Sequence, residues 1–349
     1  MRPIVRKALS SPQLGLLLVV VALAAVLTAL AGSHVNRATG QVVNNFWNSY
    51  TLMQTGTDAS FFAIMAVGAT LVIILAGIDL SVGSIYALSG VTMALTLRAL
   101  PGLGPVATVL VGLGVALGVG LLCGIFNGVM VVGLRVHSFI ITLGTMWILR
   151  GLAFVISGAQ SILLPQPLTD VAKASLGLRS ELYPVPILCM LAVTVLGMIY
   201  LSRTVMGRHI FAFGGSQEAS RFAGLSLGRI QIGVYALSGL TAGIAAFLGA
   251  SFYGSASSAD ANGYELYVIA AAVVGGASLI GGRGSAIGAM LGALLIVLIR
   301  QSIRTLHFDQ NYEWVIIGCA IIVAVVIDHW SARLAARRLS RTAARVQAA

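Results

Sequence analysis

Long apolar runs separated by short polar segments make up most of this chain. Each run is about 20 residues long, the length at which an α-helix crosses the hydrocarbon core of a bilayer. We expect about ten membrane-spanning helices, near residues 13–32, 59–77, 82–98, 105–132, 138–157, 184–201, 230–253, 266–281, 285–303 and 312–330. The breaks at Asp79 and at Gly281-Gly282 are so short that they leave open whether the helices beside them cross completely.

The basic residues predict the orientation of these helices, because Lys and Arg collect in cytoplasmic loops. With the N-terminus inside, the inner segments hold Arg2, Arg6, Lys7, Arg135, Arg203, Arg208, Arg221, Arg229, Arg283, Arg333, Arg337, Arg338, Arg341 and Arg345. The outer segments hold only Arg37, Arg98, Lys173, Arg179 and Arg304, while Arg150 and Arg300 fall in or near spans. This asymmetry favours an even number of helices with both termini in the cytoplasm.

Composition supports an all-α integral membrane protein. The 349 residues are 58% hydrophobic and only 9% charged, whereas about a quarter of the residues of a soluble domain are charged. The net charge of +11 is spread between spans without a clustered basic domain, which argues against nucleic acid as a partner. Cys123, Cys189 and Cys319 all lie in apolar runs, so we expect no disulfide framework and no metal site.

We expect one transmembrane domain over residues 1–330 and a basic tail over 331–349 that lies against membrane lipid. At the N-terminus, an apolar run ends in Ala29-Leu30-Ala31, which is similar to a signal-peptide cleavage site. The run is long for a signal peptide and can span a bilayer. A retained first helix is therefore the favoured interpretation.

Glycines at four-residue spacing predict close helix packing, since they let two helix backbones touch. They are Gly114 and Gly118; Gly120, Gly124 and Gly128; and Gly284, Gly288 and Gly292. A faint similarity between residues 77–88 and 279–291, each a polar break leading into a helix of small residues, suggests two loosely related halves.

Polar side chains within or between the spans are the candidates for a solute pathway or gate: Asp79, Ser81, Asn127, Thr142 and Thr145. Asp79 or Ser81 is expected to cap the helix that follows, while the alternative places Asp79 at the inner end of a pathway. For the other three, interhelical hydrogen bonding and pathway lining are equally open.

Arg150 lies inside a predicted span. It is expected either to extend toward the outer interface or to pair with an acid on another helix.

Residues 202–229 form a long basic segment between the sixth and seventh spans. Its second half predicts a helix of two turns with Ser216 as N-cap and Gly224 just past the end. Glu218 and Arg221 are spaced for an ion pair. The residues expected to carry the function of this segment are Gly214, Gly215, Glu218, Ala219, Arg221, Phe222, Ala223 and Gly224.

Ala219, Phe222 and Ala223 share one face of that predicted helix. The face suits either the groove of a soluble partner or an anionic lipid surface.

No catalytic motif occurs in the chain: HExxH, GxSxG and the P-loop are absent from its sequence. We therefore expect a transport subunit rather than an enzyme. Ion-coupled transport commonly uses intramembrane acids, and Asp79 alone offers little support for it. Energy is expected to come from a separate polypeptide, which would bind the ATP and Mg²⁺, so no cofactor is expected in this chain.

Several motifs in order resemble the permease subunits of bacterial ABC importers for ribose, galactose, arabinose, xylose and related sugars. They are GIDLSVGS (77–84), NG (127–128), FIITLGTM (139–146), RG (150–151), TVMGR (204–208), GG (214–215), YEL (264–266), AAVVGG (271–276) and GGRG (281–284). The match extends over about residues 60–328. Ser216, His137 and Tyr267 depart from the family pattern and leave the particular sugar open.

The resemblance implies an inner-membrane subunit that imports a monosaccharide or related polyol by alternating access. It further implies a homodimer, a cytoplasmic ABC ATPase bound through residues 214–225, and a periplasmic solute-binding protein. An ABC amino-acid permease, from a distantly related branch, and an ion-coupled secondary transporter are the alternatives.

Overall fold

The computed structural model describes residues 12–35, 40–178 and 182–316, together with 318–319, 322–323 and 326. Most of the tenth predicted span (312–330) and the whole basic tail therefore lie outside the described residues. Within them, eight helices are long and apolar enough to cross a membrane. They are α2 (Pro12–Leu30), α3 (Ser49–Ile74), α4 (Val82–Ala99), α5 (Pro105–Leu134), α6 (Ser138–Ser157), α8 (Val185–Arg203), α11 (Leu227–Tyr253) and α13 (Ala286–Thr305).

The eighth predicted span (266–281) is only a partial helix. α12 (Tyr264–Val274) has 11 residues, too few to cross a bilayer alone. It follows a non-helical segment, residues 254–263, that runs back from the end of α11 into the interior, where Ala261 approaches the first turn of α4 at Gly83. The break at Gly281-Gly282 then leads into α13, as the break at Asp79 leads into α4. The relation between the two halves stays a prediction.

Short elements cap the ends of the bundle. α7 (Gln166–Ala172), α9 (Val205–Gly215) and α10 (Gln217–Phe222) are short helices. Two antiparallel pairs, β1 (Ser33–Val35) with β2 (Val42–Asn44) and β3 (Ile162–Leu163) with β4 (Ser255–Ala256), interrupt the expected all-helical structure.

The start of α3 differs from the sequence expectation. The helix begins at Ser49, ten residues before the predicted span. The Asn48 side chain caps it by accepting a hydrogen bond from the Thr51 N–H at 2.8 Å. Hydropathy alone missed these ten residues because most of them are polar.

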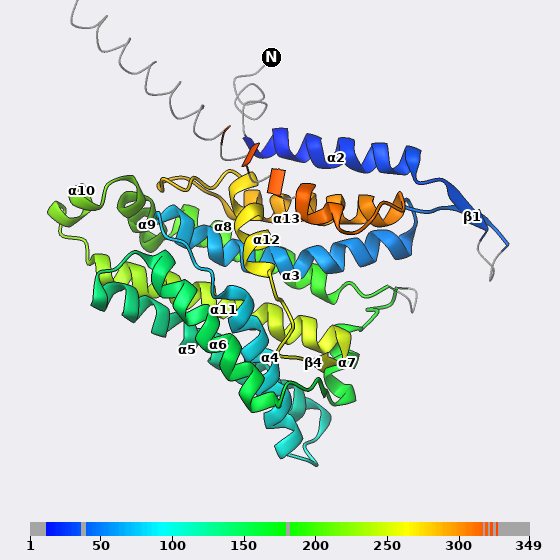
Figure 1. Ribbon diagram of the computed structural model, residues 1–349, viewed down its shortest axis with the longest axis horizontal. Helices are drawn as coiled ribbons and strands as arrows, with labels where there is room; N and C mark the ends of the chain where they lie inside the picture. Colours follow the sequence, from blue (N-terminus) through cyan, green and yellow to red (C-terminus); the bar gives the residue numbers. More distant parts are fainter. Residues whose placement is uncertain are drawn as a thin grey trace, which may run out of the picture.

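α3 is the central helix of the fold and is almost entirely buried along its apolar part. It packs against α8, α11, α12 and α13, while α4 packs against α5, α6 and α11. α2 lies along α13 at the edge of the molecule (Figure 1). In the same view α9 and α10 lie at one end of the bundle, and β1 and α7 lie toward the other.

The glycine spacing predicted close packing on one face of α5 correctly. α5 and α11 cross with their backbones touching, so that a Cβ at Gly120 would overlap the Gly239 carbonyl oxygen and one at Gly124 the Tyr235 carbonyl oxygen. A Cβ at Gly128 would lie 2.7 Å from the Cα of Ile232. Only glycine permits this approach.

A second glycine-lined contact joins α12 to α13, where a Cβ at Gly288 would overlap the Gly275 carbonyl and one at Gly292 the Ala271 carbonyl. Gly284 packs against Ile74 of α3. The expectation was wrong for Gly114 and Gly118, which have no such neighbour within 4 Å among the described residues because they lie on another face of α5.

These contacts predict opposite effects for one substitution at two sites on α5. Gly124→Ala should destabilise the protein by about 1–3 kcal/mol, because the helices must separate to admit the methyl group. Gly118→Ala should stabilise it by about 0.5–1 kcal/mol through lower backbone entropy in the unfolded chain. Thermal midpoints in detergent measure both, and equal midpoints would contradict the crossing geometry.

Candidate functional site

A buried polar cluster surrounds the break between α3 and α4. The chain leaves α3 in a turn at Ala76, which has a φ of 58°, and enters α4 at Val82. Asp79 is 2% exposed and Ser81 is fully buried. Because a carboxylate in a membrane interior is costly, its hydrogen-bond partners determine how this segment is held.

Both carboxylate oxygens of Asp79 accept hydrogen bonds. Oδ1 accepts from the Ser81 N–H at 3.0 Å and from the Ser81 hydroxyl at 2.6 Å. Oδ2 accepts from the Ser238 hydroxyl of α11 at 2.9 Å. The Asn127 amide of α5 donates to the Ser81 hydroxyl oxygen at 2.7 Å. The cluster therefore ties the break to α5 and α11.

α6 holds the other side of the same break. The Ile78 N–H donates to the Ser138 hydroxyl oxygen at 3.0 Å, and the Thr142 hydroxyl donates to the Ile78 carbonyl at 3.0 Å. Among the described residues, the Thr145 hydroxyl donates within its own helix, to the Thr142 carbonyl at 3.2 Å. The structure thus joins four of the five predicted polar residues in one network and leaves Thr145 outside it.

The capping expectation needs correction. Ser81 is the N-cap residue of α4 by position, but its side chain accepts no hydrogen bond from the first turn. Asp79 accepts the Ser81 N–H instead, so it stabilises the turn before the helix. Ser238 and Ser138, which complete the network, were missed, because a serine in an apolar run has nothing in the sequence to distinguish it.

At one end of the bundle, α9 and α10 form most of the predicted segment 202–229. The predicted helix is confirmed: the Ser216 hydroxyl accepts from the Ala219 N–H at 3.2 Å, and Gly224 follows with a φ of 78°. The expected ion pair is wrong, since Glu218 and Arg221 form none in the part of the chain that the structure describes. Phe222 is 85% exposed.

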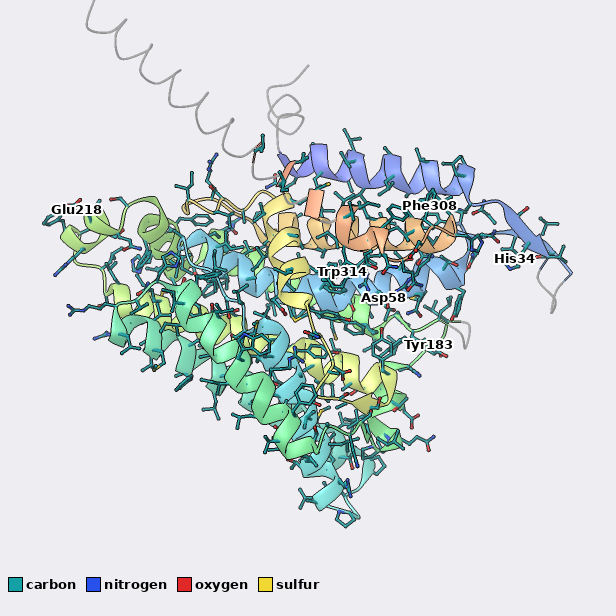
Figure 2. All side chains as sticks on the ribbon, viewed as in Figure 1. His34, Asp58, Tyr183, Glu218, Phe308 and Trp314 are labelled. Carbon is teal, nitrogen blue, oxygen red and sulfur yellow. The ribbon has the colours of Figure 1, made fainter. Side chains whose placement is uncertain are left out.

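The exposed face of α10 includes Ala219 and Ala223 as well as Phe222, while Ser220 faces inward and is buried. Figure 2 shows Glu218 at the outermost part of this end of the molecule, with His34 at the far opposite end.

Next to α10, the C-terminal ends of α3 and α9 meet the loop that precedes α13. A Cβ at Gly214 would overlap the Ile74 carbonyl oxygen and lie 2.6 Å from the Gly282 nitrogen. The Gly282 N–H donates to the same Ile74 carbonyl at 2.8 Å, and Gly215 lies beside Gly282. The C-terminal ends of α3 and α9 and the loop before α13 therefore share a backbone contact.

Arg150 of α6 does not extend to the interface, and among the described residues no acid lies at ion-pair distance from it. The residue is 9% exposed, and its guanidinium donates to three carbonyls of the segment before α12: those of Ser258 at 2.7 Å, Asp260 at 2.6 Å and Ala261 at 3.2 Å. Arg150 thus supplies the donors that this non-helical backbone needs.

Ion pairs and aromatic rings hold the opposite end together. Arg304 of α13 lies 3.6 Å from Asp58 of α3. Arg300 pairs with Glu313 at 2.7 Å and stacks over the rings of Phe62 and Tyr267, with its Cζ atom 5.5 and 5.3 Å from their centroids. These contacts join α3, α12 and α13.

The polar side chains described at these sites serve as hydrogen-bond and packing partners. No group of three or more His, Cys, Asp or Glu side chains that could hold a metal occurs among the described residues. The polar cluster contains one carboxylate, and its oxygens are already occupied by donors.

Comparisons with known proteins agree with this arrangement. Residues 51–325 match the family model described as branched-chain amino acid transport system / permease component. The ribose import permease protein RbsC of Escherichia coli K12 is 35% identical over 288 residues, which cover 82% of this chain and 86% of the relative.

Two further relatives are similar. The fructose import permease protein FrcC of Rhizobium meliloti is 34% identical over 83% of this chain and 81% of its own length. The autoinducer 2 import system permease protein LsrC of Yersinia pseudotuberculosis is 34% identical over 83% and 80%. The chain therefore belongs to the permease family of bacterial ABC sugar importers and is a multi-pass protein of the inner membrane.

Proposed function

We propose that this chain is the transmembrane subunit of an ATP-driven importer that moves a monosaccharide or related polyol by alternating access. The observation that carries the proposal is its identity of 34–35% with permeases named for ribose and fructose import, over more than four fifths of the chain. The chain has no nucleotide-binding motif, so a separate ATPase would bind the ATP and Mg²⁺.

The distribution of charge favours placing the α10 end in the cytoplasm. Arginines at that end are Arg135, Arg203, Arg208, Arg221, Arg229 and Arg283. The opposite end has Arg98, Lys173 and Arg304 among the described residues. Because basic residues collect on the cytoplasmic side, both termini would lie in the cytoplasm as well.

α10 is the proposed docking helix for the cytoplasmic ATPase. It presents Phe222, which is 85% exposed, between exposed Ala219 and Ala223, and a helix with one aromatic anchor suits a groove on a partner. Glu218 and Arg221 leave this short helix without net charge, so it lacks the basic face typical of a helix that binds anionic lipid. This lack favours the protein partner over the lipid alternative.

A mechanical connection would join this helix to the polar cluster. Movement of α10 would act through Gly214 on the Ile74 carbonyl, five residues before Asp79. The break that follows is bonded to α5, α6 and α11. A displacement at the ATPase would therefore reach three spanning helices through Asp79, Ser81, Asn127 and Thr142.

Two further partners complete the proposed importer. A periplasmic solute-binding protein would dock at the end that carries β1 and α7, and a second copy of the chain would complete the translocation path. Exposed apolar residues suit a surface against that copy or lipid: Trp147 at 69%, Leu266 at 50% and Ile280 at 65%.

Transport by the complete assembly tests the substrate class. In proteoliposomes containing the permease, its ATPase and its binding protein, we expect ribose or fructose uptake that requires ATP and Mg²⁺. Leucine uptake without sugar uptake would select the amino-acid alternative, which the name of the matching family model supports. Uptake driven by an ion gradient without the ATPase would contradict the proposal.

Phe222→Ala tests the docking helix. Loss of an aromatic anchor commonly weakens an interface by 2 kcal/mol or more, so affinity for the ATPase should fall about thirtyfold. Phe308→Ala is the matched control, because Phe308 is 59% exposed at the opposite end. Affinity is measured by titrating ATPase onto permease in nanodiscs. Equal affinities for both variants would rule out α10 as the docking element.

Two serines of α11 test the polar cluster. Ser238→Ala leaves Asp79 Oδ2 without its donor and should destabilise the protein by about 1–3 kcal/mol. Ser251→Ala, at an equally buried hydroxyl without a hydrogen-bond partner among the described residues, should change stability by no more than about 0.5 kcal/mol.

Thermal midpoints and ATP-driven uptake are measured together for the two serine variants. If the cluster transmits movement, the Ser238 variant also loses uptake per ATP hydrolysed. Unchanged stability and coupling in that variant would mean that the bond to Asp79 has no role.

A further inference from the structure

A pocket of about 250 Å³ lies toward the end of the bundle opposite α10, where the first turns of α3 meet the end of α7, α11 and the segment before α8. Figure 2 shows Tyr183 on the His34 side of the molecule, well away from Glu218. Sites for small molecules start at about 300 Å³, so an occupant of this pocket must be small. The residues that line it are Tyr50, Met53, Gln54, Thr57, Lys173, Tyr183 and Phe252.

Aromatic rings from three elements form much of the pocket wall. Phe252 of α11 is 7% exposed, and the ring of Tyr183 packs edge-on against it with the centroids 6.0 Å apart. Tyr50 of α3 is 61% exposed. The face of an aromatic ring is electron-rich, and the C–H groups of a sugar ring are weakly positive. Such a wall therefore suits the C–H face of a sugar.

Gln54 offers this pocket an acceptor whose orientation is fixed. Its Nε2 donates to Asp58 Oδ1 at 3.0 Å, and Asp58 is itself held by the Tyr253 hydroxyl at 3.3 Å and by Arg304 at 3.6 Å. Because the amide nitrogen is committed to Asp58, the amide oxygen remains to accept a hydrogen bond from an occupant.

Two donors complete the polar part of the lining. The Lys173 ammonium lies 5.4 Å from the centroid of the Phe252 ring, and no acid among the described residues is at ion-pair distance from it. Thr57 lies on the same face of α3 as Gln54 and is 1% exposed, yet its hydroxyl has no hydrogen-bond partner in the part of the chain that the structure describes. A buried hydroxyl without a partner is costly, so an occupant that bonds to it gains affinity.

The combination selects a neutral polyhydroxy ring among small ligands. An apolar occupant would leave Gln54, Thr57 and Lys173 without partners. A cation would be repelled by Lys173, which already covers the Phe252 ring. A sugar has C–H groups for the rings and hydroxyls that both donate and accept.

We propose that this pocket binds a monosaccharide, with its hydroxyls on Gln54 Oε1, the Thr57 hydroxyl and the Lys173 ammonium. It is a site on the extracytoplasmic face of the permease, where the sugar is held before it enters the translocation path. The choice of a sugar and the location rest on the proposed import function. The aromatic and polar lining does not depend on it.

Saturation-transfer NMR tests the site on the full-length permease in nanodiscs, without the ATPase or the binding protein. Ribose, fructose and leucine are the probes. Thr57→Val keeps the shape of the side chain and removes the hydroxyl, and Tyr183→Leu removes the ring. Thr194→Val is the control, because Thr194 of α8 is 3% exposed, also has a hydroxyl without a partner among the described residues, and does not line the pocket.

We expect at least one of the two sugars to bind saturably to the wild type and to the Thr194 variant. Thr57→Val should weaken that binding about two- to tenfold, and Tyr183→Leu should weaken it as well. The thermal midpoint of the sugar-free Thr57 variant should stay at or above that of the wild type, since this hydroxyl has no bond to lose. A purely structural role would lower the midpoint and leave binding unchanged, which would overturn the proposal.

Uptake of the same sugars by the complete assembly separates this proposal from the import function. If uptake occurs but the permease alone binds neither sugar, or if the Thr57 and Thr194 variants bind equally well, the site is wrong and import stands. Binding of leucine in place of the sugars also overturns the site. Sugar binding that Thr57→Val weakens, without uptake of either sugar, would support the site and count against the import function.

Discussion

Non-helical backbone in a bilayer must find every hydrogen-bond partner within the protein, since lipid offers none. Two such segments, residues 76–81 and 254–263, lie inside this bundle. Side chains from α5, α6 and α11 satisfy the first through Asp79 and Ile78. Arg150 satisfies three carbonyls of the second. The requirement explains why α3 and α4 occupy the centre, where neighbours surround the break on every side.

The need to satisfy polar groups inside the membrane also explains why buried and exposed charged residues have different roles in the structure. Arg150 and Asp79 are buried and bind backbone or hydroxyl groups rather than each other. Breaking either set would leave an unpaired charge at membrane depth, which costs far more than a lost surface contact. The arginines of the α10 end are exposed instead, and their position affects orientation and partner binding rather than folding.

Local patterns in the sequence predicted much of the helical framework. The limits of α6 were predicted to the residue, Ser216 was identified as a cap, and the spacing of Gly120, Gly124 and Gly128 predicted close packing on one face of α5. Each depends on residues close in sequence. Ser238 was missed because it lies 159 residues from Asp79 and resembles any other serine in an apolar helix. The convergence of Gly214, Ile74 and Gly282 likewise needs the three-dimensional arrangement, as does the depth at which α12 begins.

The two ends of the bundle are held by contacts that differ in how they respond to movement. Near α10, backbones touch at Gly214 and Gly282 without intervening side chains, so a displacement of one segment must displace the next. At the opposite end, α3 and α13 meet through the Asp58–Arg304 pair. Arg304 is partly exposed, and an ion pair of that kind contributes only about 0–1 kcal/mol. The glycine-lined end therefore suits transmission of force, while at the opposite end the Asp58–Arg304 pair adds little to the packing of Arg300 over Phe62 and Tyr267 that joins the same helices.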